Sequence, residues 1–186
     1  MKRAFDVVAA AIGIVLLGLP ALLIALVIRL TSKGPAVYWS DRVGRNNRIF
    51  RMPKFRTMRV DAPAVATHLL KDPARYVTPV GAFLRRTSLD EMPQLWSILA
   101  GDMSVVGPRP ALFNQDDLVK LRTDAGVHVL VPGLTGWAQV RGRDELPIPV
   151  KVEFDKYYLH HQSLAFDLKI IGLTLIKVIA GEGVHH

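Results

Sequence analysis

The chain contains no cysteine, and this absence excludes disulfide bonds, thiolate nucleophiles and cysteine-based metal sites. Its six histidines include no HExxH pattern or other paired spacing typical of zinc ligands, so we interpret them as surface or hydrogen-bonding residues. His185 and His186 end the sequence and are assigned no role, whether native or an added tail. Charged side chains are missing altogether from Val7 to Ile28. The sequence therefore excludes thiol chemistry and points to a membrane-associated N-terminal segment.

Basic residues outnumber acidic ones, which gives the chain a formal net charge of +8. A surplus of this size favours anionic partners: phosphates, acidic lipid headgroups or nucleic acid. A length of 186 residues suits one domain with its own core and is short for two. We therefore predict one functional unit, with a membrane segment over residues 1–32 followed by one domain over residues 33–186.

The uncharged segment admits two membrane arrangements. It is too long for the apolar part of a typical signal peptide, and a helix over it would reach roughly 33 Å, enough for a single span. Pro20 favours a re-entrant helix, because proline removes a backbone hydrogen bond and predicts a kink near Leu19. A straight span would also leave one basic flank outside; the flanks are Lys2, Arg3, Arg29, Lys33, Arg42 and Arg45. We predict the re-entrant helix bent at Pro20, with the single span as the alternative.

Beyond this segment, the pattern predicts a helix-rich α/β fold of the α+β kind. Two β-prone stretches on either side of Gly44 to Asn47 predict a small β-hairpin. Apolar residues at helical spacing predict a final helix over residues 163–180, either a core helix or an amphipathic helix in the membrane interface. Other helices are expected over residues 63–70, 80–86 and 90–100, the last ended by Gly101. Ordered loops that shape a site are expected at residues 101–112 and 130–150, with a linker at 147–149.

Asp90 and Glu91 form an acidic pair with two readings. Ser88 and Glu91 match a capping box, but Pro93 would then fall fifth in the helix, so Asp90 is the better N-cap. A carboxylate at that position is held ionised by the helix dipole and by neighbouring arginines such as Arg85. An ionised aspartate can act as a covalent nucleophile, and the acid beside it can help to hold Mg²⁺. On local features alone, a purely capping role for Asp90 stays open.

Three other segments carry cations suited to phosphate. Lys54 and Arg56 stand two residues apart, so on an extended segment both project from one face. Arg109 lies in a stiff Gly-Pro-Arg-Pro turn, and its planar fork suits a phosphate. Residues 132–143 contain three glycines that permit close backbone approach, together with polar and cationic side chains. We predict a diphosphate-binding site whose candidate residues are Lys54, Arg56, Arg85, Gly107, Pro108, Arg109, Gln139 and Arg141.

With these segments in this order, the chain resembles the bacterial sugar transferase family, the monotopic phosphoglycosyl transferases. The resemblance covers nearly the whole chain and rests on the Pro-broken apolar helix followed by KFRTM, SLDEMPQL, GDMSVVGPRP and PGLTGWAQV. It implies a small, catalytic-domain-only enzyme at the cytoplasmic face of the bacterial inner membrane. That enzyme would use Mg²⁺ to move a phospho-sugar from a UDP-sugar to undecaprenyl phosphate, releasing UMP, in the first membrane step of polysaccharide or glycoconjugate assembly.

The resemblance also implies roles for single residues. Asp90 would attack the β-phosphate and carry the phospho-sugar covalently, and Glu91 would serve as metal ligand or base. The cations named above would steady phosphates, and Gln139 would lie near the nucleotide. Two positions depart from the family pattern: Val131 stands where the family often has Arg, and Arg141 where it often has Asn. The family roles of those two positions are therefore not assigned to this chain, and Arg141 is a candidate residue for the choice of sugar or nucleotide.

Alternatives stay open for the donor sugar and for the class of protein. An N-acetylhexosamine such as N-acetylgalactosamine is the preferred sugar, while glucose, galactose and a diamino sugar stay open. A membrane-anchored basic binding module is a second class, but no recognised nucleic-acid motif is present, so we expect no nucleic-acid partner. An inactive scaffold is a third, against which the intact Asp90–Glu91 pair argues. The sequence does not indicate the oligomeric state.

Overall fold

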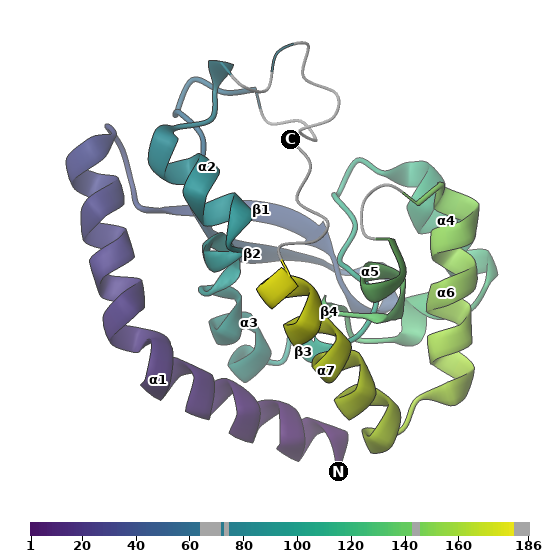
Figure 1. The fold of residues 1–186 in the computed structure, drawn as a ribbon. Coiled ribbons are helices and arrows are strands. Elements are labelled where there is room, and N and C mark those ends of the chain that lie inside the picture. Colours follow the sequence, from purple (N-terminus) through teal and green to yellow (C-terminus); the bar gives the residue numbers. More distant parts are fainter. Residues whose placement is uncertain (64–71, 73–74, 143–145, 181–186) are drawn as a thin grey trace.

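The computed structural model describes residues 1–63, 72, 75–142 and 146–180 (Figure 1). Within these ranges, helices surround two small sheets. In chain order the elements are α1 (Lys2–Thr31), β1 (Val37–Val43), η1 (Arg45–Asn47), β2 (Ile49–Phe55), α2 (Pro79–Arg86), η4 (Leu89–Glu91), α3 (Gln94–Ala100), β3 (Ser104–Val106), α4 (Asp116–Asp124), η5 (Val127–Val129), β4 (Gly133–Thr135), α5 (Trp137–Gly142), α6 (Ile148–His161) and α7 (Leu164–Ala180). This helix-rich α+β architecture confirms the predicted fold class at that level.

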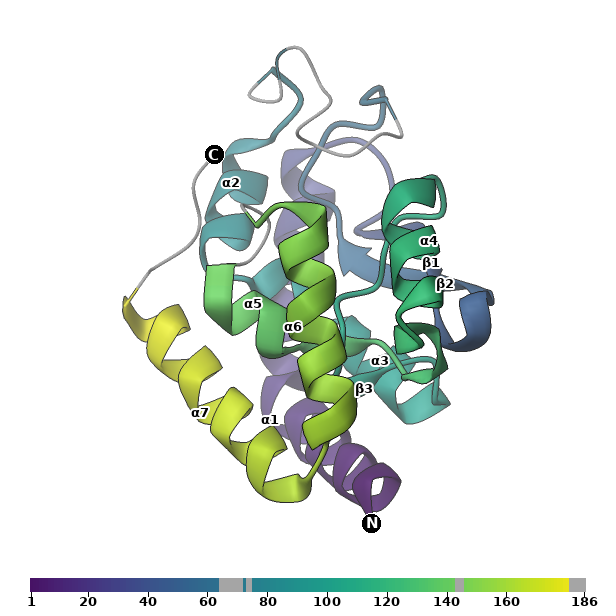
Figure 2. The same cartoon turned by 90° about the vertical axis from the view of Figure 1, so that its right-hand side faces the viewer.

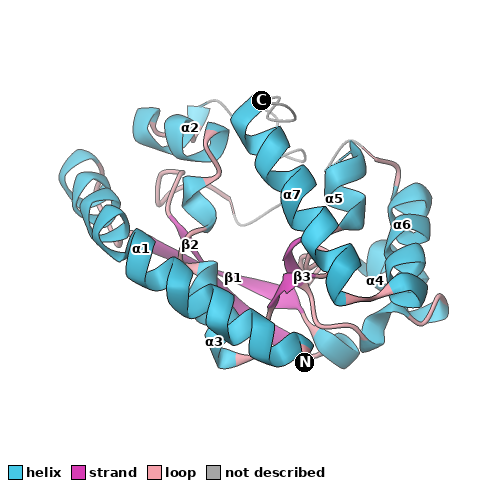
Figure 3. Cartoon of the chain, turned by 60° about the horizontal axis from the view of Figure 1, so that its bottom comes forward, coloured by secondary structure: helices cyan, strands magenta, loops and turns pink. Residues whose placement is uncertain are grey.

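The predicted hairpin is confirmed in the antiparallel pair β1–β2, which lies in the middle of the molecule between helices (Figure 3). The strands pair in the register that sets Ser40 opposite Met52, both buried. The connection needs two residues with positive φ, and it uses Asn46 (54°) and Asn47 (60°). Asparagine tolerates this left-handed region better than most residues, so the sequence of the connection matches its geometry.

Part of the predicted loop regions is regular structure instead. The segments 101–112 and 130–150 contribute β3 and β4, which pair in parallel with Ser104 opposite Gly133 and Val106 opposite Thr135. Each strand is three residues long and lies among glycines and prolines, so no strand pattern is visible in the sequence.

Three of the described α-helices were not predicted: α4, α5 and α6. Helix α5 lies within the segment 130–150 that was predicted as a loop. The predicted linker at 147–149 is wrong, because these residues begin α6: Pro147 precedes the helix and Pro149 lies in its first turn, where a missing N–H costs nothing. The short polar helix α4 was also missed. Two predicted helices fare better, since 80–86 is confirmed as α2 and 163–180 as α7. The helix predicted over 63–70 lies almost wholly outside the described residues.

Helix α1 runs continuously from Lys2 to Thr31 and changes direction partway along, so that it wraps around one side of the molecule (Figure 1). Its first half packs through Ala10 against Ile98 and Met103, and its last turns pack through Ile28 against Phe55 and Leu84. Pro20 lies between these two contact regions, where its missing N–H weakens the helix and permits the bend. By length and composition, α1 is long and apolar enough to cross a membrane.

The face of α1 turned away from the rest of the chain is apolar and exposed. Leucines on it keep more than half of their surface accessible: Leu16, Leu19, Leu22, Leu23, Leu26 and Leu30. Helix α7 lies at the edge of the molecule in Figure 2. It has a similar division: Ile170 is fully buried in the core with Tyr158, whereas Leu168 and Leu175 are exposed. Apolar surface of this extent on two helices is typical of an interaction surface.

Candidate functional site

The acidic pair lies in a tight turn between α2 and α3, and not at the start of a helix as predicted. Helix α3 begins at Gln94, with Pro93 at its N-cap position. An α-helix through Asp90 would need an N–H at residue 93 to bond the carbonyl of Leu89, and Pro93 has none. The chain instead forms the 3₁₀ turn η4, in which the Met92 N–H donates to that carbonyl. The prediction of Asp90 as an N-cap is therefore wrong.

A strained residue introduces this turn. Ser88 has φ of 56° and ψ of 16°, the left-handed conformation, which costs a non-glycine residue on the order of 1 kcal/mol or more. At the other end, Gly101 (φ 100°) terminates α3 as predicted. The geometry of the turn, and not a helix dipole, therefore presents Asp90 and Glu91.

Glu91 is the centre of an ion-pair cluster. Its Oε1 accepts from Lys54 Nζ at 2.8 Å and from Arg109 Nη2 at 3.0 Å. Burial alone would raise the pKa of Glu91, but Arg109 and Lys54 together lower it well below its usual range. Glu91 is therefore ionised and joins the end of β2 to the loop after β3.

Asp90 has a different electrostatic environment. Burial raises the pKa of this carboxyl above its usual range, and the neighbouring charge of Glu91 raises it further. Lys54, Arg109 and Arg85 act in the opposite direction without cancelling the effect of burial. The predicted lowering of the Asp90 pKa by Arg85 is confirmed in direction, but the predicted helix dipole is absent and burial outweighs the cations. The net direction was not predictable, because the sequence does not reveal how deeply the turn is enclosed.

Arg85 is held beside the pair by the strand segment after β2. Its Nε donates to Thr57 Oγ1 at 2.9 Å, and Thr57 is itself buried. Helix α2 approaches this segment so closely that a Cβ built on Gly81 would lie 2.0 Å from the Thr57 carbonyl oxygen. Burial lowers the pKa of Arg85, while Asp90 raises it. Glycine at position 81 thus permits the approach that brings Arg85 to the acidic pair.

The Gly-Pro-Arg-Pro turn directly follows β3. Gly107 N–H donates to the Thr135 carbonyl, and Gly133 N–H donates to the Pro108 carbonyl, both at 2.9 Å. A Cβ on Gly107 would lie 2.4 Å from the Val131 carbonyl oxygen, so only glycine fits between the two backbones. Gly107 and Pro108 therefore act through their backbones, and they place Arg109 against Glu91.

Three predicted site residues are not joined to the acidic pair by the contacts described. Arg56 points the other way: β2 ends at Phe55, and the buried Arg56 guanidinium bonds Lys33 O, Ser32 O and Ser32 Oγ at the end of α1. The prediction that it shares an anion-binding face with Lys54 is wrong. Helix C-terminal carbonyls attract a cation, which explains its position.

Gln139 and Arg141 lie on α5. Gln139 Nε2 donates to Leu134 O at 3.0 Å, and its Oε1 is buried without a described hydrogen-bond partner. That Oε1 would lie 2.8 Å from a Cβ on Gly136, close to the Gly107 carbonyl. Arg141 stacks over the Trp137 ring at 4.2 Å and is exposed. Gln139 thus lies beside the turn that carries Arg109, whereas Arg141 faces an aromatic surface groove.

The donor set of the acidic pair can be compared with the needs of Mg²⁺. In the described part of the chain, no group of three or more His, Asp or Glu side chains gathers for a metal ion. The cluster of Lys54, Arg85, Arg109, Asp90 and Glu91 holds three cations and two anions, a formal balance of +1. Mg²⁺ usually binds one or two carboxylates together with substrate phosphates. The residues therefore fit Mg²⁺ that enters with a phosphate-bearing ligand, and do not fit a closed protein cage.

Several polar residues with buried contacts were missed by sequence reasoning. Asp6 accepts from Val105 N–H at 3.0 Å, and Lys2 Nζ lies 2.8 Å from Asp167 Oδ2. Arg122 forms a buried ion pair with Asp155. A lone acid at the edge of an apolar run was a visible signal for Asp6; the other contacts join residues far apart in the sequence.

The chain belongs to the bacterial sugar transferase family, whose model matches residues 1–181. It is 39% identical over 185 residues to the UDP-glucose:undecaprenyl-phosphate glucose-1-phosphate transferase of Escherichia coli K12, covering 95% of this chain and 40% of that protein. It is 36% identical over 188 residues to the UDP-N-acetylgalactosamine-undecaprenyl-phosphate N-acetylgalactosaminephosphotransferase of Aeromonas hydrophila, covering 98% and 44%. The chain thus spans less than half the length of these two relatives.

A shorter relative is matched over most of its length. The exopolysaccharide production protein ExoY of Rhizobium meliloti is 38% identical over 200 residues, covering 98% of this chain and 87% of that protein. The resemblance identified in the sequence is confirmed, because the family match spans the apolar helix, the acidic pair and the Gly-Pro-Arg-Pro turn together.

Proposed function

We propose that the chain is a phosphoglycosyl transferase that moves a phospho-sugar from a UDP-sugar to undecaprenyl phosphate through a covalent aspartyl intermediate. The observation that carries the proposal is the cluster at the α2–α3 turn. Asp90 has no hydrogen-bond donor among the described contacts, whereas the neighbouring Glu91 is occupied by Lys54 and Arg109. The carboxylate without such partners is the one available to react.

In the first step, an Asp90 carboxylate oxygen attacks the β-phosphorus of the donor. A bond forms between that oxygen and phosphorus, and the bond from phosphorus to the bridging oxygen breaks, so that UMP leaves with the bridging oxygen. In the second step, a phosphate oxygen of undecaprenyl phosphate attacks the same phosphorus. The bond from Asp90 to phosphorus breaks, which yields the lipid diphosphate sugar and restores the carboxylate.

The surrounding cations stabilise the charge that develops on the transferring group. Lys54 and Arg109 are held by Glu91, and Arg85 is held by Thr57, so the positions of these cations are set before the donor binds. Preset charges of this kind do most of the catalytic work in phosphoryl transfer. The raised pKa of Asp90 adds to the reactivity of its ionised form, because a more basic carboxylate is a better nucleophile.

Mg²⁺ is proposed as the cofactor, held by Asp90 and Glu91 with the diphosphate. When bound there, it would neutralise phosphate charge. Glu91 Oε1 already accepts hydrogen bonds from Lys54 and Arg109, so Glu91 would offer its second carboxylate oxygen to the metal. Glu91 also keeps Lys54 and Arg109 in position in the absence of donor.

A re-entrant arrangement of α1 is proposed, at the cytoplasmic face of the inner membrane. The contacts at its two ends support it. Near the start, Arg3 Nη2 donates to Leu99 O at 2.7 Å, and at the end Ser32 Oγ accepts from Arg56 Nη2 at 2.7 Å. A straight helix of this length would reach about 45 Å, so one that crossed a bilayer would carry one end away from the domain. Both ends instead meet the same domain, with Pro20 and the exposed leucines between them.

The absence of cysteine allows a clean test of this arrangement. A single cysteine added ahead of Met1 in whole cells should resist a membrane-impermeant thiol reagent and react after the inner membrane is opened. Labelling in intact cells would show that the N-terminus is periplasmic and would overturn the re-entrant proposal in favour of a single span.

The chemical proposal is tested by a donor half-reaction. Detergent-solubilised protein is incubated with Mg²⁺ and UDP-N-acetylgalactosamine, UDP-glucose or UDP-galactose; UMP release and the mass of the chain are then measured. We propose an N-acetylhexosamine as the preferred donor. Native protein should gain the mass of a phospho-sugar, Asp90→Asn should release no UMP, and the exposed control Asp102→Asn should behave as native. UMP release by Asp90→Asn at the native rate would refute the covalent scheme.

A further inference from the structure

The backbone of Arg109 is itself held by a buried ion pair from outside the cluster. Arg122 on α4 donates through Nη1 to the Arg109 carbonyl at 2.7 Å. The same guanidinium donates through Nε and Nη2 to Asp155 Oδ2 on α6, at 2.9 and 2.7 Å. Asp155 is 1% exposed and Arg122 is 8% exposed. All the described hydrogen bonds of the Arg122 guanidinium therefore go to two partners: the Asp155 carboxylate, and the backbone carbonyl of Arg109 in the turn.

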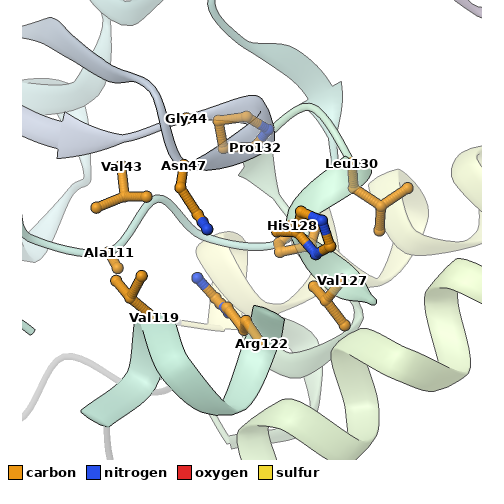
Figure 4. Close-up of a pocket in the computed structure, with 11 residues that line it drawn as sticks. Val43, Gly44, Asn47, Ala111, Val119, Arg122, Val127, His128, Leu130 and Pro132 are labelled. Atoms are coloured by element: carbon orange, nitrogen blue, oxygen red, sulfur yellow. The ribbon is translucent and has the colours of Figure 1, made fainter. Parts of the chain in front are cut away.

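The turn borders a small cavity on this side. Pro108 and Ala111, on either side of Arg109, line a small cavity of about 30 Å³ together with Arg122 and His128. Figure 4 shows Arg122 rising from α4 toward this space, with Asn47 and His128 across it. A cavity of this size holds no more than a water or two. Ala111 packs with Leu118 and Val152, and hydrogen bonds to the backbone add to that packing in positioning the turn.

Those hydrogen bonds reach four successive carbonyls, from Pro108 to Ala111. Gly133 N–H donates to Pro108 O, Arg42 Nη1 to Pro110 O at 3.2 Å, and Val43 N–H to Ala111 O. The bond to Arg109 O comes from a charged donor and is the shortest of the set. It therefore restrains the residue whose guanidinium meets Glu91.

The free-energy cost of burying the Arg122–Asp155 ion pair argues that stability alone does not explain its presence. Burial raises the pKa of Asp155, and Arg122 offsets only part of that effect. Buried ion pairs of this kind can often be replaced by apolar residues of similar volume without loss of stability. A role in placing Arg109 would account for a charged pair at this position.

We propose that Arg122 and Asp155 are positioning residues that orient Arg109 for the phosphates of the substrate. The proposal rests on the phosphate-binding role given to Arg109 above. Asp155 fixes the direction of the Arg122 guanidinium, and Arg122 fixes the carbonyl of Arg109. The arginine side chain then leaves the turn in the direction of Glu91 and the donor.

The test separates position from stability through the double variant Arg122→Met, Asp155→Leu, which keeps apolar volume and removes both charges. Full-length protein in detergent is examined by calorimetric titration with UDP and by thermal unfolding. We expect the variant to unfold close to the native temperature and to bind UDP about tenfold more weakly, as losses of supporting contacts commonly do. The matched control is Lys120→Gln, Asp124→Asn, an exposed ion pair on the same helix, which should bind UDP as native.

A cycle with Arg109→Ala tests whether the effect passes through Arg109. In that background the double variant should cause no further loss of UDP affinity, since the side chain that it orients is gone. Additive losses, or native affinity in the double variant alone, would overturn the proposal. If the double variant does not fold, Asp155→Asn replaces it, with an intermediate loss expected and native affinity as the refuting result. Failure of the native protein to bind UDP would instead remove the phosphate role of Arg109, and the positioning role with it.

Discussion

Asp6 offers a sharp test of how helix α1 is joined to the rest of the chain. Its carboxylate is 3% exposed and meets the start of β3, where it accepts from Val105 N–H at 3.0 Å and from Ser104 Oγ at 2.9 and 3.0 Å. Two residues further on, β3 leads into the turn that carries Arg109. The substitution Asp6→Leu should therefore loosen both the helix and the turn.

The size of the effect follows from the groups left behind. The Ser104 hydroxyl has one hydrogen and can turn to the Val106 carbonyl at 3.0 Å, so it stays satisfied. The Val105 N–H loses its side-chain acceptor, at a cost of about 1–3 kcal/mol, and the loss of the charged bond itself adds about 1 kcal/mol. For a chain of this size, a total of roughly 2–4 kcal/mol lowers the unfolding temperature by roughly 5–12 °C. Asp6→Asn keeps an acceptor and should lose only about 1 kcal/mol.

The assay is thermal unfolding in detergent followed by tryptophan fluorescence, with UMP release measured on the same samples. The order of unfolding temperatures should be native, then Asp6→Asn, then Asp6→Leu, with UMP release declining in the same order. Asp102→Asn, an exposed acid, should match native. If Asp6→Leu unfolds within a degree of native, the contact between α1 and β3 does not hold the domain together, and the reasoning is refuted.

Two further outcomes follow from the site. Because the folded-state pKa of Asp90 is raised, the rate of the donor half-reaction should fall as pH drops through that pKa. Glu91→Gln should shift this acid limb of the rate-against-pH profile to lower pH, since removing the Glu91 charge lowers the pKa of Asp90. An acid limb that stays in place or moves to higher pH would contradict the assignment. Gly81→Ala sets a methyl 2.0 Å from the Thr57 carbonyl oxygen, so it should lower the free energy of unfolding by about 1–3 kcal/mol and reduce UMP release. The control Gly172→Ala on α7 meets nothing within 4 Å and should leave stability and UMP release unchanged. Equal unfolding temperatures for the two variants would show that α2 can move without cost.

Features that depend on neighbours in sequence were predictable. The hairpin follows from β-prone stretches around a Gly-Arg-Asn-Asn connection, α7 from its apolar spacing, and the end of α3 from Gly101. The proline inside α1 and the types of residue in the cluster were equally visible. The sequence pattern identified each member of the cluster as a candidate, because carboxylates and cations in stiff segments are typical of phosphate chemistry: Asp90, Glu91, Lys54, Arg85 and Arg109.

What the tertiary structure alone decided is where each charge goes. Arg56 and Lys54 look equivalent in the sequence, yet one meets the end of α1 and the other meets Glu91. The direction of the Asp90 pKa reversed, because burial is a property of the surrounding fold and not of the local chain. The contact of Arg122 with Asp155 spans 33 positions, and that of Asp6 with Val105 spans 99. Local sequence determines which conformations and charges are available, whereas packing of distant segments determines their partners, since electrostatic and hydrogen-bonding energies depend on distances that only the folded chain sets.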